Sequence, residues 1–168
     1  MAALDDLARR LDSAVAAIVA LRDRLDRTGP WPLAELYGTE AEAHWGPHEV
    51  LAHVDEMLRF WLGEVERIVA AEPATGPVPF GRVADDPLRI GIIGRDRRLP
   101  LGELLDRVAA DGRRVAARMR ELTATEAQRT GEHQTRGAFT VSALLERFVV
   151  VHIEEHVSQL TETLAAGR

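Results

Sequence analysis

The chain has 168 residues, contains no cysteine, and carries a formal net charge of −6 at pH 7 from 27 acidic and 21 basic residues. This length fits a single domain over residues 1–168, and the lack of cysteine excludes disulfides, thiolate metal ligands and a cysteine nucleophile. The excess of acidic residues argues against a protein that follows the phosphates of a nucleic acid.

The first predicted element is an amphipathic helix near the N-terminus. Apolar residues recur there every three or four positions, which places them on one helical face: Leu4, Leu7, Leu11, Val15, Ile18, Leu21 and Leu25. Gly29 and Pro30 predict its end. No part of the chain is apolar for long enough to cross a bilayer, and the N-terminus lacks the apolar stretch of a signal peptide. We therefore expect a cytoplasmic protein without a membrane partner.

The second predicted helix begins at Pro47, because proline suits the first helical position, and it ends before Pro73. Its apolar face includes Val50, Val54, Met57, Trp61 and Val65. Residues 73–99 then contain many prolines and glycines, which predicts a long irregular connection that crosses the bundle.

The third and fourth predicted helices follow this connection. One runs from Pro100 to Leu122, and the other begins after Thr140, a suitable N-cap, and continues to Leu164; a polar loop, 123–138, separates them. Four amphipathic helices of this length bury their apolar faces best by packing together. The predicted fold class is therefore all-α, a four-helix bundle.

Three histidines are predicted to meet inside this bundle. His152 and His156 are four residues apart, so both rings project from one face of the last helix. His53 shares the apolar face of the second helix with Val50 and Met57. Buried imidazoles need partners for both ring nitrogens, and a divalent ion would satisfy three of those nitrogens at once. Three protein ligands leave one coordination position open, as in catalytic sites.

The positions of these histidines also predict the topology. His53 lies roughly 10 Å from the start of its helix, while the midpoint of His152 and His156 lies roughly 16 Å from the end of the last helix and roughly 21 Å from its start. Matching these levels favours antiparallel second and fourth helices. The long 73–99 connection then lets the second and third helices run the same way, giving an up-down-down-up bundle.

Several other residues are candidates for supporting roles. Glu49 and Glu155 lie at helical offsets from the histidines and are candidate catalytic groups. Arg82 and Gln159 are candidate cofactor-binding residues, since an arginine can hold a carboxylate. The remaining histidines are expected to be exposed to solvent: His44, His48 and His133.

Two segments resemble the DinB-like superfamily. They are WGPHEVLAHVDEM at residues 45–57 and HIEEHVSQL at residues 152–160. The resemblance implies an up-down-down-up four-helix bundle with a divalent metal, zinc or nickel, on His53, His152 and His156. It also implies a homodimer. Some members of the family use the thiols mycothiol or bacillithiol in transfer or isomerisation reactions.

The predicted function is activation of a low-molecular-weight thiol at the metal for transfer to a small electrophilic substrate. A metal-dependent hydrolase of small substrates is the first alternative. The HIEEH string matches the HxxEH pattern of inverted zinc proteases, but such proteases need a further carboxylate ligand well downstream, and the chain ends twelve residues after His156. The second alternative is a metal-binding bundle without catalytic activity, and no nucleic-acid partner is expected.

Overall fold

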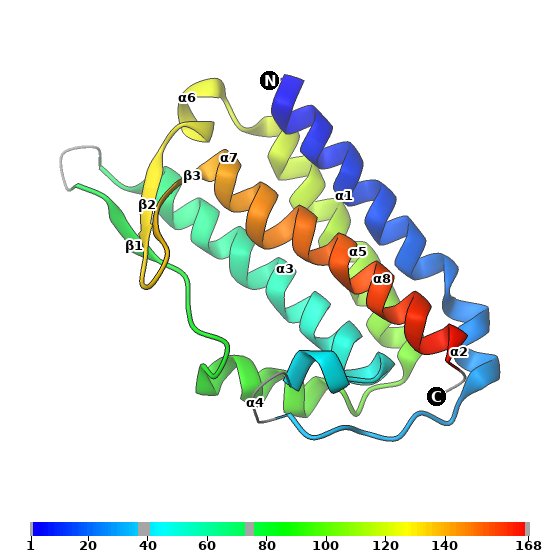
Figure 1. The fold of residues 1–168 in the computed structure, drawn as a ribbon. Coiled ribbons are helices and arrows are strands. Elements are labelled where there is room, and N and C mark those ends of the chain that lie inside the picture. The colour runs from blue at the N-terminus through cyan, green and yellow to red at the C-terminus, as the bar shows by residue number, and fades with distance from the viewer. Residues whose placement is uncertain (1, 37–40, 73–75, 167–168) are drawn as a thin grey trace.

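The computed structural model describes residues 2–36, 41–72 and 76–166. Long helices packed side by side make up most of the molecule (Figure 1). They are α1 (Ala2–Ala20), α3 (Pro47–Ala70), α5 (Leu101–Glu121) and α8 (Val151–Ala165). In the described ranges, no helix is both long and apolar enough to span a membrane.

Short helical elements connect or extend the long ones. A break at Leu21 divides the first predicted helix into α1 and α2. Thr140 caps the last helix as predicted, because its side chain accepts a hydrogen bond from the backbone N–H of Ala143. The short elements are α2 (Arg22–Thr28), a 3₁₀ helix (Ala41–His44), α4 (Pro87–Asp96), α6 (Ala124–Ala127), α7 (Val141–Leu144) and a π-helical segment (Leu145–Val150).

Ion pairs between the long helices define their directions. Asp12 of α1 pairs with Arg120 of α5, and Arg22 just beyond α1 pairs with Asp106, so α1 and α5 are antiparallel. The pairs Arg59–Asp111 and Arg118–Glu66 join α3 and α5 at rising positions in both helices, so these two run in parallel. Trp61 stacks on Phe148 while His53 faces His152, which makes α3 and α8 antiparallel.

The prediction of a mostly helical bundle is confirmed, but the all-α class left out a small three-stranded sheet that caps one end of the bundle (Figure 1). The strands are β1 (Val78–Phe80), β2 (Thr130–His133) and β3 (Gly137–Thr140). β1 pairs with β2 in parallel, with Val78 opposite Gly131, and β2 pairs with β3 as an antiparallel hairpin. Phe80, only 2% exposed, anchors the sheet through edge contacts with Trp61 and Phe148.

The expectation that residues 73–99 are irregular throughout was also wrong. β1 and α4 both lie within this connection. Asp86 caps α4 by accepting a hydrogen bond from the backbone N–H of Arg89, and Pro87 occupies the first turn. The connection thus carries an ordered helix that places Arg89 against the bundle.

Gly112 allows α1 and α5 to pack closely, because a Cβ atom there would lie 2.7 Å from Val15 Cγ2. We expect Gly112→Ala to lower the free energy of unfolding by roughly 1 kcal/mol, since overpacking outweighs the gain in helix propensity. Gly63→Ala is the matched control, because Gly63 is also mid-helix but has open space around it; it should stabilise the protein by up to about 1 kcal/mol. Urea unfolding measures both changes, and equal stabilisation by both variants would contradict the close packing at Gly112.

A buried pair of carboxyl groups, Asp55 and Asp111, lies between α3 and α5. Asp55 is fully buried, and its Oδ1 has no hydrogen-bond partner among the residues that the structure describes. Burial and the hydrogen bond to Asp111 raise the pKa of Asp55 to about 7, against the opposing charge of Arg59. A proton shared between the two carboxyl groups supplies the donor that Oδ1 otherwise lacks.

The raised pKa of Asp55 predicts a pH-dependent stability. The folded state holds this proton more tightly than the unfolded chain, whose aspartate has a pKa near 3.8. The stabilisation is therefore complete below about pH 4 and is lost as the pH rises through about 7. We expect Asp55→Asn, which mimics the protonated group, to remove this component of the slope in urea unfolding. The exposed Asp6→Asn should keep it, and parallel curves for wild type and Asp55→Asn would contradict the shared proton.

Candidate metal centre

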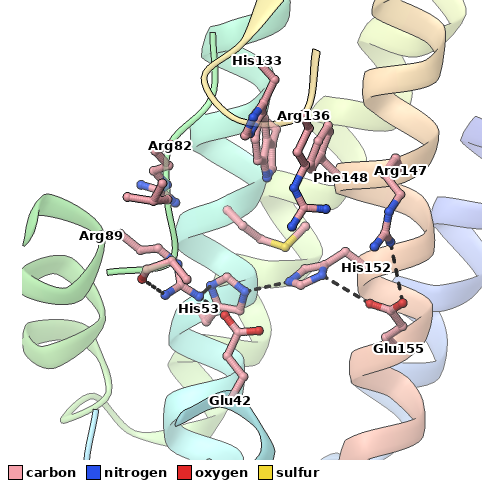
Figure 2. A pocket seen from close by; sticks show the side chains of 14 residues that line it. Glu42, His53, Arg82, Arg89, His133, Arg136, Arg147, Phe148, His152 and Glu155 are labelled. Atoms are coloured by element: carbon pink, nitrogen blue, oxygen red, sulfur yellow. Dashed lines mark hydrogen bonds and ion pairs between the residues drawn. The ribbon is translucent and has the colours of Figure 1, made fainter. Parts of the chain in front are cut away.

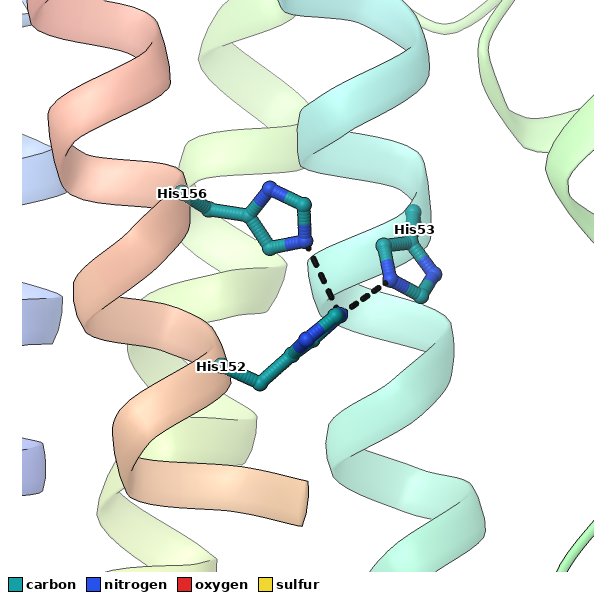
Figure 3. A group of neighbouring side chains, drawn as sticks. All are labelled: His53, His152 and His156. Atoms are coloured by element: carbon teal, nitrogen blue, oxygen red, sulfur yellow. Dashed lines mark hydrogen bonds between the residues drawn. The ribbon is translucent and has the colours of Figure 1, made fainter. Parts of the chain in front are cut away.

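The rings of His53, His152 and His156 converge between α3 and α8 (Figure 3). The Nε2 atom of His152 lies 3.0 Å from that of His53 and 3.1 Å from that of His156. Their ligand atoms all lie within 4.8 Å of one another. Around a tetrahedral zinc ion, ligand nitrogens at about 2.1 Å from the metal are roughly 3.4 Å apart. The three imidazoles therefore already have nearly the spacing that one ion requires.

The neighbours of His156 determine which of its nitrogens carries the proton. The side-chain amide nitrogen of Gln159 donates to the backbone carbonyl of Glu42 at 2.5 Å, so the amide oxygen faces His156. This oxygen accepts a hydrogen bond from His156 Nδ1 at 2.8 Å. In a neutral ring, a protonated Nδ1 leaves the Nε2 lone pair free to bind a metal.

His152 has the same arrangement in a looser form, because its Nδ1 lies 3.4 Å from a carboxylate oxygen of Glu155. That carboxylate favours a proton on Nδ1 and leaves Nε2 unprotonated. The Nε2 lone pairs of His152 and His156 then face each other across 3.1 Å. Two facing lone pairs repel unless a positive charge lies between them.

Burial makes protonation of these rings unfavourable, so a proton is not the source of the positive charge between the lone pairs. Desolvation, with the nearby His156 and Arg89, holds the pKa of His53 well below its ordinary value. Desolvation also lowers the pKa of His152, and desolvation with the neighbouring His152 lowers that of His156 to about 4. All three rings are thus neutral near pH 7, which is the form that binds metals. The donor set fits a divalent ion of the zinc or nickel type.

A π-helical segment, Leu145–Val150, directly precedes the two histidines of α8. The backbone N–H of Val151 donates to the carbonyl of Glu146, five residues earlier, which is the π-helical pattern. Phe148 of this segment and His152 both reach the same cavity. The wider turn thus sets how the aromatic side chain and the histidine pair are placed relative to each other.

A cavity of about 340 Å³ opens beside His53 and His152 (Figure 2). Trp61 and Phe148 form an apolar wall, with stacked rings 4.6 Å apart. Four arginines also line the cavity: Arg82, Arg89, Arg136 and Arg147. Three of them have carboxylate partners, in the pairs Arg82–Glu56, Arg89–Glu42 and Arg147–Glu155.

Most of the candidate supporting residues lie at this site, but Glu49 does not. Glu155 and Arg82 line the cavity, and Gln159 contacts a metal-site ring rather than the cavity. Glu49 is completely buried, and its carboxylate accepts hydrogen bonds from the backbone of Ala34 and from the Arg97 side chain. These contacts give Glu49 a structural role in holding the 31–36 segment and the end of α4 against α3.

The prediction that His133 is exposed was wrong. His133 is 3% exposed, and its ring stacks on that of Phe148 at 5.3 Å with only 5° between the planes. Its Nδ1 accepts a hydrogen bond from the backbone N–H of Thr135, so its proton is on Nε2. The sequence around His133 is polar, and its burial depends on the unpredicted sheet. His44 is exposed, as expected, whereas His48 is partly buried.

Sequence reasoning missed the role of Glu42 and Arg89. Arg89 is 6% exposed, and its guanidinium pairs with Glu42 beside His53 (Figure 2). The two residues are 47 positions apart, on the 3₁₀ helix and on α4. No local sequence pattern indicates such a pair. The helix that carries Arg89 has one sign in the sequence, which is Pro87 at the start of α4.

Comparisons with known proteins agree with this fold. The family model described as the DinB superfamily matches residues 17–160. A solved structure, YfiT from Bacillus subtilis, superposes with a TM-score of 0.71 at 16% sequence identity, covering 97% of this chain and 86% of that one. YfiT is described as a probable metal-dependent hydrolase with an unusual four-helix bundle topology. No curated protein matches the chain.

Proposed function

The chain belongs to the DinB superfamily, and from this premise we propose that it is a metal-dependent enzyme that acts on small molecules. The observation that carries the proposal is the convergence of three neutral imidazoles beside a cavity of about 340 Å³. His53, His152 and His156 would hold one divalent ion, zinc or nickel, through their Nε2 atoms. Three protein ligands leave room for an exchangeable one, which a purely structural ion does not need.

The reaction we propose is the transfer of a low-molecular-weight thiol to an electrophile. A divalent ion at this site would lower the pKa of a thiol or water molecule bound to it and so provide a nucleophile at neutral pH. The chain has neither cysteine nor lysine, so its own side chains supply neither a thiolate nor a Schiff base.

The charges of the cavity favour a nucleophile that needs no general base from the protein. Its two carboxylates are both ion-paired, Glu42 with Arg89 and Glu155 with Arg147. Among the described lining residues, no carboxylate is left to take a proton from water without first breaking an ion pair. Trp61 and Phe148 would exclude bulk water on the other side of the cavity.

Hydrolysis of a small ester or amide is the second candidate function. The likeness to YfiT, itself described as a probable metal-dependent hydrolase, favours it. Glu155 would then be the candidate base, because its side chain is 57% exposed and its pair with Arg147, at 3.7 Å, is loose. Both reactions use the same three histidines and differ in the nucleophile.

One experiment separates these functions. Protein purified without a histidine tag is loaded with zinc or nickel and incubated with aryl halides and epoxides, with and without mycothiol, bacillithiol or glutathione. A parallel sample is incubated with aryl esters and amides in the absence of thiol. Thiol consumption that depends on the metal supports the proposal. Hydrolysis of aryl esters or amides without thiol supports the second candidate. A fully loaded protein that does neither would be a metal-binding bundle without activity, which contradicts both.

A further inference from the structure

One arginine of the cavity has no acidic partner. Arg82, Arg89 and Arg147 each pair with a glutamate, as described above. Within the described ranges, Arg136 forms neither an ion pair nor a hydrogen bond, and its contact is with the ring of Phe148, 5.8 Å from the guanidinium carbon. The cavity therefore contains one positive charge that no group in the described part of the chain offsets, before any metal is counted.

The guanidinium of Arg136 faces the cavity, although the residue is exposed to solvent. It lies in the turn between β2 and β3, and its guanidinium extends past Phe148 toward His152 (Figure 2). Here the charged group faces the same space as the open side of the histidine cluster.

The turn that carries Arg136 is firmly held. Gln134 donates a hydrogen bond to the backbone carbonyl of Gly81 at 2.9 Å, which ties the turn to the end of β1. His133 is buried and stacked on Phe148, and the backbone N–H of Thr135 donates to its ring. These contacts fix the backbone at Arg136, so only its side chain has to become ordered when a ligand binds.

The lining of the cavity indicates what kind of group would accompany an anion. Trp61 and Phe148, whose rings stack on each other, form an apolar side of the lining together with Met57 and Val83. A volume of about 340 Å³ is at the small end for a ligand site. The ligand that fits is compact, with an apolar body and one anionic group.

We propose that the substrate is a small carboxylate with an apolar body, and that Arg136 binds its carboxylate group. The planar guanidinium matches a carboxylate through two parallel hydrogen bonds. The inference rests on the proposed function, since it takes this cavity as the substrate site, and it assigns Arg136 the role of a substrate-binding residue.

The test uses benzoate as the probe and isothermal calorimetry on the zinc-loaded protein. Benzamide is the neutral comparator and phenyl phosphate the second anion. We expect benzoate to bind in the millimolar range or tighter, and Arg136→Gln to weaken it at least about tenfold. Arg136→Lys, which keeps the charge without the fork, should fall between them. Arg113→Gln removes the same charge from an exposed position outside the cavity and should bind benzoate as the wild type does.

Four results would overturn the inference. Equal benzoate binding by Arg136→Gln would mean that the metal alone holds the carboxylate. Equal binding of benzamide would remove the need for charge, and tighter binding of phenyl phosphate through Arg136 would make the ligand a phosphate. Absence of binding by all three probes would also reject it. Zinc content and the thermal midpoint confirm that each variant is folded.

This outcome is separable from that of the proposed function. If the protein binds benzoate through Arg136 but transfers no thiol and hydrolyses nothing, the anion site is supported and the proposed reaction is contradicted. If the protein is active with thiols but its Arg136→Gln variant binds benzoate unchanged, the proposed reaction is supported and the anion site is contradicted.

Discussion

His152→Ala is expected to abolish stoichiometric metal binding. Elemental analysis of untagged wild-type protein should give close to one zinc or nickel ion per chain, and the variant should retain almost none. His152 Nε2 is the central atom of the cluster, at 3.0 and 3.1 Å from the other two Nε2 atoms. Since loss of an orienting neighbour alone weakens metal sites about 10–100-fold, loss of a ligand should weaken affinity by more than about a hundredfold.

His152 is the informative choice among the three ligands because its side chain is 26% exposed, whereas His53 and His156 are buried in the core. Truncating it should leave the bundle folded. His44→Ala is the matched control, since His44 is exposed and lies outside the cluster. Equal metal content in wild type and His152→Ala would refute the three-histidine site, provided that circular dichroism shows both proteins folded.

Gln159→Leu is expected to weaken metal binding by about 10–100-fold without abolishing it. Gln159 is a positioning residue that contacts the ligand His156 through its Nδ1 atom, at 2.8 Å, and fixes the free lone pair on Nε2. Leucine has no acceptor, so the ring loses the contact that selects the metal-binding tautomer. Competition with a chelator of known affinity, measured across pH, gives the change.

Gln159→Glu separates positioning from packing, because glutamate keeps an oxygen acceptor for the ring. We expect it to restore most of the affinity lost in Gln159→Leu and to shift metal release to lower pH, since a carboxylate partner makes the imidazole a stronger base. Ser158→Ala, on the exposed neighbouring position, should have no effect. If both substitutions at position 159 reduce affinity equally, the hydrogen bond has no special role.

The helices and the histidine cluster follow from properties that the sequence carries locally. A spacing of four residues puts His152 and His156 on one face of any helix, whatever the helix packs against. The apolar neighbours of His53 indicate its orientation in the same way. The structure agrees because these patterns depend on helical periodicity, which tertiary contacts seldom override over long segments.

The sheet and the charged wall of the cavity depend instead on contacts between distant segments. β1 has three residues and includes Pro79, and β2 begins Thr-Gly-Glu, so neither has a recognisable strand pattern. They pair across about 50 positions of sequence, Val78 with Gly131. The burial of His133 and the inward direction of Arg136 both follow from that pairing, which explains why the polar loop gave no sign of either.

The π-helical segment gives the last part of the chain room for a change in length. A π-helical turn accommodates one more residue than the α-helical turn it replaces, so deleting any residue of 145–150 should convert it to regular α-helix. His152 and His156 would then keep nearly their present direction relative to Thr140 and the hairpin before it, because the deleted residue is the one that the wider turn absorbs. A homologous sequence that is one residue shorter between the threonine cap and the histidine pair should therefore hold its histidines on the same face, and an alignment should place the gap within 145–150.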